Sequence, residues 1–214
     1  MSDDSIYDFP DVASADENGL LAIGGNLSSG TLIKAYSKGI FPWYNPGEMV
    51  QWYSPDPRFI LFPKKIKISH SMRNVFNKHF FKFTVDKAFT RVIHNCRISK
   101  RTGEPETWIG DDIEIAYTDL FKKGLAHSAE AWQNNELVGG LYGVLLGKVF
   151  FGESMFAKKS NASKFAFIKL VDVLQKNGIE LIDCQVYTEH LESLGAEFIR
   201  REEFMTMVKR LIAK

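Results

Sequence analysis

The sequence is poor in cysteine and contains no long apolar run. Of the 214 residues only Cys96 and Cys184 are cysteines, and neither belongs to a Cys-x-x-Cys pair. This pattern is that of neither a disulfide scaffold nor a zinc site. No stretch approaches the roughly 18 uninterrupted apolar residues that a membrane span needs. We therefore expect a reduced, cytoplasmic protein with no membrane partner.

Several common catalytic signatures are also missing. The chain has no P-loop, no HExxH, no GxSxG and no GxGxxG after a strand. Its five histidines are scattered without the spacing of metal ligands. The first twenty residues contain six acidic residues and no basic one, which is the opposite of a signal peptide. We expect neither a metal site nor export.

The charge is balanced over the whole chain but uneven along it. The formal net charge of +1 provides no overall field that would attract nucleic acid. Residues 1–63 carry a net −5 and residues 102–214 a net −4, whereas residues 64–101 hold eleven Lys and Arg against one acid. Phenylalanines are interleaved with these cations, a pattern that suits phosphate-backbone binding. The segment 64–101 therefore predicts nucleic-acid contact; the alternative is a solvated face whose aromatics belong to the core.

The sequence divides at residue 63 into two predicted domains. Residues 1–63 read as a small, turn-rich N-terminal domain, because the stretch 41–63 carries five prolines and proline fixes φ and removes a donor. Residues 64–214 mix helical and strand periods, which is typical of an α+β domain. Periodicity and capping residues predict helices over 67–78, 87–97 (capped by Asp86), 111–123, 161–176, 188–195 and 201–214, and strands over 81–86, 127–133, 136–147, 148–156 and 179–187. Gly139 and Gly140 indicate a bulge or a close backbone approach.

Polar side chains interrupt two of the apolar strands. Asp183 and Gln185 stand two residues apart in LIDCQV, and Glu153 lies in FFGESMF. Burying a carboxylate is costly unless it is paired or hydrogen-bonded. Asp183 alone is explained equally well by pairing with a core Arg or a helix cap, but three such groups on neighbouring strands favour a functional site. Trp43 and Trp52, in turn-rich sequence, either line a groove or belong to the core.

Taken together, several motifs resemble one known family. The strings NGLLAIGGNL, AYSKGIFPWY, WYSPDPR, TWI, AHSAEAW, ELVGGLYG, FFGESMF, ASK, LIDCQ, HLESLGA and RREEF occur in this order over nearly the whole chain. They resemble the leucyl/phenylalanyl-tRNA–protein transferase family. Departures are small: Tyr53 stands where the family often has a second Trp, and Asn26 where Asp is usual.

The resemblance implies both a fold and an activity. The implied fold is a small N-terminal domain joined to a GNAT-like acyltransferase domain. The implied reaction transfers Leu or Phe, and Met less well, from aminoacyl-tRNA to proteins that begin with Arg or Lys, in the N-end rule degradation pathway. Because the ester of aminoacyl-tRNA is already activated, no ATP, metal or other cofactor is expected. We expect a monomer, since the sequence has no heptad repeat.

The resemblance also implies roles for individual residues. Asp183 and Gln185 are the catalytic candidates: Asp183 holds or deprotonates the acceptor amine, directly or through Gln185, or both residues only position the substrates. The candidates for binding the acceptor side chain, the adenosine and the transferred amino acid are Glu153, Trp52, Trp108, Leu141 and Phe150. The candidates for binding tRNA are Lys64, Lys65, Lys67, Arg73, Lys158, Lys159 and Lys164.

Two other functions are compatible with this type of domain. One is a coenzyme A-dependent N-acyltransferase, but FAKKSNASKFA lacks the glycines that hold a pyrophosphate before the helix. The other is an RNA-binding module without activity, which the presence of Asp183, Gln185 and Glu153 disfavours.

Overall fold

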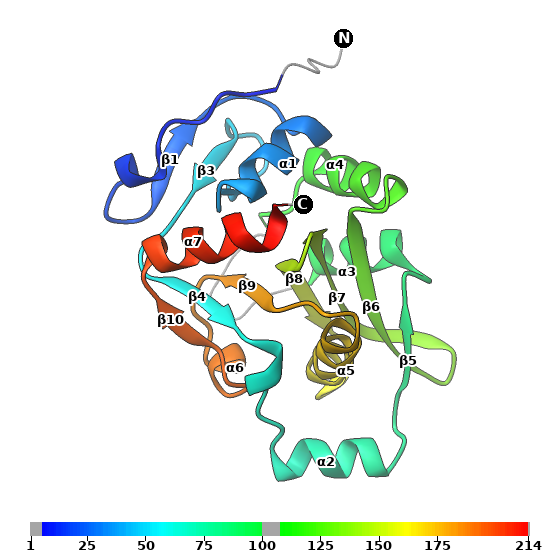
Figure 1. Cartoon of the computed structure of the whole chain (residues 1–214). Helices are drawn as coiled ribbons and strands as arrows, with labels where there is room; N and C mark the ends of the chain where they lie inside the picture. The colour runs from blue at the N-terminus through cyan, green and yellow to red at the C-terminus, as the bar shows by residue number, and fades with distance from the viewer. Residues whose placement is uncertain (1–5, 100–107, 214) are drawn as a thin grey trace.

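Two β-sheets organise the chain, a small one near the N-terminus and a large one through the middle of the molecule (Figure 1). The computed structural model describes residues 6–99 and 108–213. Lys100 and Arg101, two cations of the predicted basic segment, lie outside these ranges. No helix in the described ranges is long and apolar enough to cross a membrane.

The small sheet has three antiparallel strands in the order β1-β3-β2, namely β1 (Leu20–Ile23), β3 (Gln51–Tyr53) and β2 (Phe41–Pro42). A 3₁₀ turn, η1 (Val12–Ser14), precedes it, and helix α1 (Ser29–Ser37) follows β1. The hydroxyl of Ser28 caps this helix by accepting the N–H of Thr31 at 3.2 Å. The buried face of α1, which includes Leu32, Ala35 and Tyr36, packs in the core.

The large sheet has seven strands in the order β10-β4-β9-β8-β7-β6-β5. Only the pair β8–β9 is parallel, and all the other neighbours are antiparallel. The strands are β4 (Arg58–Leu61), β5 (Lys82–Val85), β6 (Ala126–Gln133), β7 (Glu136–Leu146), β8 (Val149–Ala157), β9 (Leu181–Gln185) and β10 (Glu197–Ile199).

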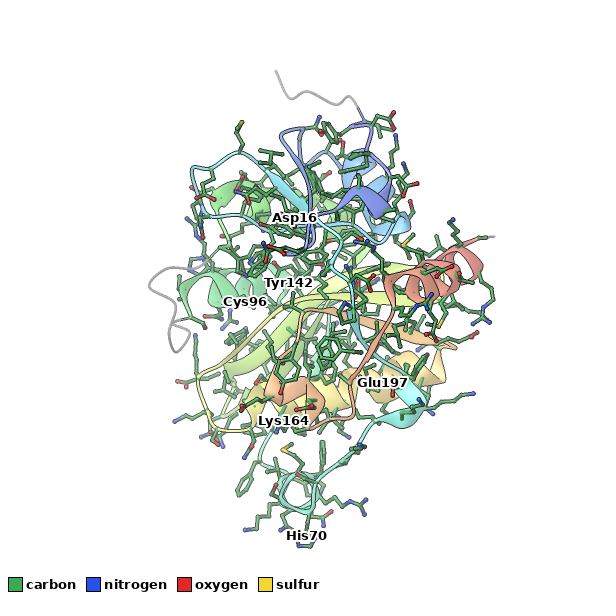
Figure 2. All side chains as sticks on the ribbon, turned by 90° about the vertical axis from the view of Figure 1, so that its left-hand side faces the viewer. Asp16, His70, Cys96, Tyr142, Lys164 and Glu197 are labelled. Carbon is green, nitrogen blue, oxygen red and sulfur yellow. The ribbon has the colours of Figure 1, made fainter. Side chains whose placement is uncertain are left out.

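Helices cover both faces of the large sheet. On one face lies a core with side chains of α1, α3 (Phe89–Ile98), α4 (Asp111–Lys122) and α7 (Arg201–Ile212). On the other face lies a core with side chains of α2 (His70–Asn77), α5 (Ala162–Lys176) and α6 (Glu189–Glu192). Helix α2 follows a 3₁₀ turn, η2 (Pro63–Lys65), and lies at the lower end of the molecule in Figure 2, where His70 is labelled. This mixture of antiparallel strands and packed helices confirms the predicted α+β class.

Strand β4 was not predicted from the sequence. It is only four residues long, fully buried, and lies in the proline-rich stretch that predicts turns alone. It pairs with β9 and β10, so the large sheet includes a strand from the predicted N-terminal domain 1–63. The domain boundary at residue 63 stays a prediction.

The predicted cap of α3 was wrong. Ala88 occupies the N-cap, without a side-chain cap hydrogen bond. Asp86 instead accepts the N–H of Ser128 at 2.7 Å and pairs with His127 at 2.8 Å. A buried carboxylate, Glu130, accepts the N–H of Ala88 at 3.3 Å. The backbone N–H of the N-cap residue Ala88 is therefore hydrogen-bonded to Glu130 of the neighbouring strand β6, and Asp86 does not cap the helix.

Candidate active site

The site lies where the parallel strands β8 and β9 stop pairing. Their last paired residues are Phe151 and Asp183. Two residues farther along each strand stand Glu153 and Gln185, which meet through side chains instead: Nε2 of Gln185 donates to Oε1 of Glu153 at 2.9 Å. The predicted meeting of these polar groups on neighbouring strands is confirmed.

A pocket of about 440 Å³ opens at this point. Its volume is in the range, about 300–1,000 Å³, of small-ligand pockets. Much of its wall is apolar, and the predicted residue Leu141 belongs to it. The apolar lining includes Leu141, Met155, Phe167, Ile182, Val186 and Leu191, and the polar lining includes Glu153, Ser154, Gln185, Thr188 and His190, with the side chain of Asp183 fully buried behind them.

Glu153 is the central acid of the pocket. Its Oε1 accepts hydrogen bonds from Tyr36 at 2.8 Å and Gln185 at 2.9 Å, and its Oε2 accepts one from Tyr117 at 2.9 Å. Burial raises the pKa of Glu153 to about 7, the charge of Asp183 acts in the same direction, and the three hydrogen bonds oppose them. The carboxyl therefore changes charge near neutral pH.

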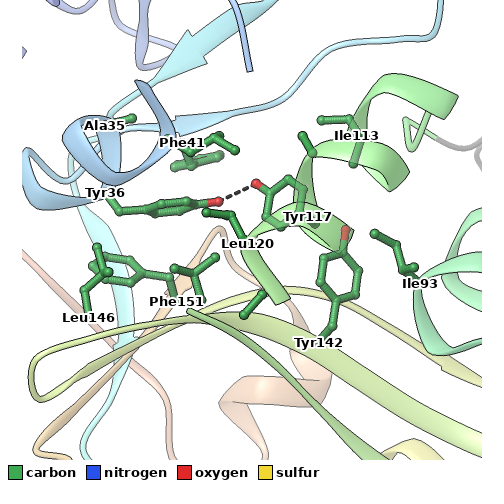
Figure 3. Packing of buried hydrophobic residues seen from close by; sticks show 14 of the residues in the cluster. Ala35, Tyr36, Phe41, Ile93, Ile113, Tyr117, Leu120, Tyr142, Leu146 and Phe151 are labelled. Carbon is green, nitrogen blue, oxygen red and sulfur yellow. Dashed lines mark hydrogen bonds between the residues drawn. The ribbon is translucent and has the colours of Figure 1, made fainter. Parts of the chain in front are cut away.

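Tyr36 and Tyr117 are also hydrogen-bonded to each other, as Figure 3 shows. Burial is the main cause that raises both tyrosine pKa values well above the usual range, so both hydroxyls keep their protons. The triangle of Tyr36, Tyr117 and Glu153 has three contacts, but two hydroxyls supply only two protons. All three contacts hold a proton only when the carboxyl of Glu153 is protonated, and one of them lacks a proton when it is ionised.

Asp183 lies behind Gln185 and forms a buried ion pair with Arg58. The Nε and Nη2 atoms of Arg58 donate to Oδ1 and Oδ2 of Asp183 at 2.8 and 2.6 Å. The two side chains are 1% and 0% exposed. Pairing with a core Arg, the structural explanation left open by the sequence, therefore applies to Asp183. The same Oδ1 also accepts the N–H of Gln185 at 2.9 Å, so the ion pair belongs to the site as well.

Three predicted substrate-binding residues do not line this pocket. Trp52 is buried in the core that includes α1, α3, α4 and α7, and its Nε1 donates to the carbonyl oxygen of Gly24 at 2.8 Å. Trp108 is buried in the same core, and Phe150 is buried in the core on the other side of the large sheet. In contrast, Trp43 is 41% exposed.

The predicted tRNA-binding cations form two groups. Lys64 and Lys65 lie in η2, Lys67 follows it and Arg73 is in α2; all four are exposed, although Lys65 is paired with Glu197 at 2.5 Å. The second group surrounds the start of α5, where Lys158 and Lys159 are exposed and Lys164 is half-buried. Helix α2, which carries Arg73, contacts α5 through the rings of Phe76 and Phe165, whose centroids are 5.1 Å apart. Lys164 is also near the pocket, since its charge, after burial, lowers the pKa of His190.

Sequence reasoning missed several residues of the site. Arg58 carried a usable signal, because it opens the otherwise apolar run RFILF. Tyr36 and Tyr117 carried none, since they occupy the apolar faces of helices, as core residues do. His190 lines the pocket from the start of α6. In the described ranges, no three His, Cys, Asp or Glu side chains are placed to hold a metal ion.

Comparisons with known proteins identify the family. Residues 60–209 match the family model for leucyl/phenylalanyl-tRNA protein transferase, and residues 25–56 match the model for its N-terminal domain. The leucyl/phenylalanyl-tRNA--protein transferase of Flavobacterium johnsoniae is 55% identical over 201 residues, covering 94% of this chain and 95% of that protein. That of Syntrophus aciditrophicus is 50% identical over 206 residues, covering 96% and 86%.

Solved structures with a similar arrangement are more distant. L-PGS from Bacillus licheniformis has a TM-score of 0.45 at 14% identity, covering 87% of this chain and 71% of that one. A GCN5-related N-acetyltransferase-like protein from Streptococcus suis has a TM-score of 0.40 at 12% identity, covering 81% and 66%.

The chain is an aminoacyltransferase with an α+β fold, and its residues 25–56 match the N-terminal domain of the family. It belongs to the leucyl/phenylalanyl-tRNA–protein transferase family, whose members transfer an aminoacyl group from tRNA to proteins. Its donor is therefore an aminoacyl-tRNA and its acceptor a protein.

Proposed function

We propose that this enzyme transfers Leu or Phe, and Met less well, to proteins that begin with Arg or Lys. In this role it marks proteins for degradation by the N-end rule, as a monomer in the cytoplasm. The observation that carries the proposal is the contact of Glu153 with Gln185 at the polar side of a largely apolar pocket. An acid beside an apolar pocket suits one cationic and one apolar substrate group.

The cationic group is the first side chain of the acceptor. An ionised Glu153 pairs with a guanidinium or ammonium group, and such charge-assisted hydrogen bonds are among the strongest in proteins. Tyr36, Tyr117 and Gln185 fix the carboxylate in one orientation. An acceptor that begins with an uncharged residue offers this carboxylate no counter-charge.

The apolar group is the side chain of the transferred amino acid. Leu141, Met155 and Phe167 line the part of the pocket assigned to it. An apolar pocket discriminates by size only weakly, by about 1–3 kcal/mol per methylene. Transfer of Met alongside Leu and Phe follows from this limit.

The reaction joins the acceptor α-amino nitrogen to the ester carbonyl carbon and releases the 3′-oxygen of the terminal adenosine. Because the ester is already activated, the enzyme accelerates the reaction by aligning the two substrates and by hydrogen bonding to the reacting groups. The amide oxygen of Gln185 accepts an N–H of the attacking amine while its Nε2 donates to Glu153. The proton that the amine loses balances the one that the leaving oxygen gains. Asp183 has no exposed surface and acts through Gln185.

The tRNA lies along the two groups of cations. Lys158, Lys159 and Lys164 at the start of α5 face the acceptor end, because Lys164 adjoins His190 in the pocket wall. The second group, at η2 and α2, binds the phosphates farther along the acceptor stem. Its members are Lys64, Lys65, Lys67 and Arg73.

A transfer assay tests this proposal. The enzyme is incubated with Leu-tRNA and an equimolar mixture of two peptides that differ only in their first residue, Arg or Met. Mass spectrometry is expected to show one added Leu on the Arg peptide alone. Gln185→Ala should abolish most of this transfer, whereas Gln133→Ala, at the distant end of β6, should leave it unchanged.

The possible outcomes test the proposed donor and the proposed acceptor separately. Equal modification of both peptides would contradict the role given to Glu153. No transfer from Leu-tRNA or Phe-tRNA by the unaltered enzyme would contradict the donor assignment. Normal transfer by Gln185→Ala would remove Gln185 from the reaction.

A further inference from the structure

Arg58 reaches the site from a part of the chain remote from the other polar residues. It is the first residue of β4, and its guanidinium carbon lies 4.7 Å from the ring centroids of both Phe41 and Phe204. These rings belong to the small sheet and to α7. The cation is thus held between two aromatic rings while it pairs with Asp183.

The residue that this ion pair supports has a rare backbone conformation. Gln185 has φ of +64°, in the left-handed region that non-glycine residues seldom occupy. The N–H of Val186 donates to the carbonyl oxygen of Cys184 at 2.8 Å, which closes a three-residue turn around Gln185. Turns of this kind with positive φ are strained and persist only where their surroundings fix them.

Asp183 supplies that fixation. Its Oδ1 accepts the backbone N–H of Gln185 at 2.9 Å and, at the same time, Nε of Arg58 at 2.8 Å. Its Oδ2 accepts Nη2 of Arg58 at 2.6 Å. The order of contacts is therefore Arg58 to Asp183, Asp183 to the turn, and the Gln185 side chain to Glu153.

The same geometry argues against Asp183 as a base. Both of its oxygens already accept from a guanidinium that is 1% exposed. Taking up a proton would leave this cation buried and unpaired, which is strongly unfavourable. To deprotonate the acceptor amine directly, Asp183 would need an oxygen exposed to the pocket, but its side chain is fully buried.

We propose that Arg58 is a positioning residue of the transfer reaction. The Arg58–Asp183 pair is a clamp that holds the Gln185 turn, and the negative charge of Asp183 serves Arg58 rather than the acceptor amine. This inference rests on the proposed function, in which the Gln185 side chain touches the reacting amine. It predicts that the charges of the pair are dispensable if the contact to the Gln185 backbone is kept.

A neutral replacement of the pair tests the proposal. Asp183→Asn keeps an Oδ1 that accepts the Gln185 N–H but leaves Arg58 without a counter-charge, and Arg58→Gln leaves Asp183 without one. Each single change is expected to lower kcat by about 100-fold, because small displacements at a reacting centre have effects of this size. In the double variant the two amides pair with each other, and kcat should recover to within about tenfold of the unaltered enzyme, because the two changes compensate.

Folding is monitored alongside activity. The melting temperature should fall in both single variants and recover in the double variant. If the double variant does not unfold cooperatively, Arg58→Met is used in place of Arg58→Gln. A second readout is the pH dependence of kcat/KM, whose acid limb should persist in the double variant and move to lower pH, because the charge of Asp183 no longer raises the pKa of Glu153.

The results discriminate between the two roles of Asp183. A double variant that melts cooperatively but is as inactive as Asp183→Asn would overturn the proposal, because the charge would then take part in the chemistry. Loss of activity through KM for the peptide, with kcat intact, would overturn it too. If the unaltered enzyme transfers nothing, the proposed function has failed, and this outcome is distinct from a failure of the clamp.

Discussion

Gln185 and Glu153 meet across the point where β8 and β9 no longer pair, with Nε2 of Gln185 2.9 Å from Oε1 of Glu153. A side-chain hydrogen bond thus takes over where the backbone ladder stops. The two functional groups become accessible because the strands that carry them are free of each other at this point. The geometry of the candidate site therefore depends on where the parallel pairing ends.

The raised pKa of Glu153 predicts a specific pH dependence. Because its pKa is about 7, Glu153 is mostly protonated at pH 6 and mostly ionised at pH 8. If the ionised form binds the cationic acceptor, kcat/KM for an Arg-starting peptide rises through pH 7, together with a further rise near pH 8 from the acceptor amine. Glu153→Gln should lower kcat/KM and remove the limb near pH 7 only. Its control, Glu136→Gln in an exposed position of β7, should have the profile of the unaltered enzyme.

Pocket size predicts the preference between Leu and Phe. Leu141 is 2% exposed and lies on the pocket wall opposite Met155 in the strand register. Leu141→Phe should narrow the pocket and lower Phe transfer more than Leu transfer, changing their ratio about tenfold or more. Competition between Phe-tRNA and Leu-tRNA measures this ratio. The control is Leu145→Phe, on the same strand but outside the pocket, which should leave the ratio of Phe to Leu transfer unchanged. An equal change of this ratio in the control would contradict the assignment of Leu141 to the pocket for the transferred side chain.

The cations at η2 and α2 predict a salt dependence of tRNA binding. Reversing Lys67 and Arg73 to Glu should weaken binding and reduce the slope of log K against log salt by about 1–2, since each lost phosphate contact contributes about 0.7–0.9. Reversing Lys122 and Lys209, exposed cations of α4 and α7, is the control with equal net charge. Equal slopes for the two variants would show that position does not matter and would remove Lys67 and Arg73 from the tRNA surface.

At Gly139 an added methyl group is expected to lower the stability of the fold. A Cβ there would stand 2.6 Å from Cβ of Ala162 and 2.9 Å from the backbone nitrogen of Ser163, at the start of α5. Gly139→Ala should displace this helix and lower the free energy of unfolding by about 1–3 kcal/mol, measured by urea denaturation. Gly152→Ala is the control, because its Cβ would meet only the carbonyl oxygen of Asp183 at 3.5 Å. An unchanged midpoint for Gly139→Ala would contradict the close approach.

The elements with strong periodic signals were predicted well. The hairpin from β6 to β7 turns at Asn134 and Asn135, both with positive φ, between the strands that the sequence predicted over 127–133 and 136–147. The close backbone approach expected at Gly139 is also confirmed. Glu153, Asp183 and Gln185 stood out because they are polar groups in apolar strands, and they meet in one pocket. Local pattern was sufficient where the neighbours lie on adjacent strands.

The remaining features depend on contacts between distant parts of the chain. Strand β4 is too short to produce a periodic signal, and its state is decided by β9 and β10 on either side. Tyr36 and Tyr117 look like core residues until Glu153 is placed between them. Trp52 looks like a candidate for stacking, but the small sheet buries it completely. Such residues acquire their roles only from packing that no local window contains.

The position of β4 also has a consequence for synthesis on the ribosome. Arg58 leaves the ribosome 125 residues ahead of its partner Asp183. Both strands that flank β4 lie beyond residue 180, so the segment RFIL has no sheet partner until they have been synthesised. A nascent or truncated chain therefore carries an unpaired, aggregation-prone strand and an unformed active site. The candidate site therefore forms only after β9 has been synthesised.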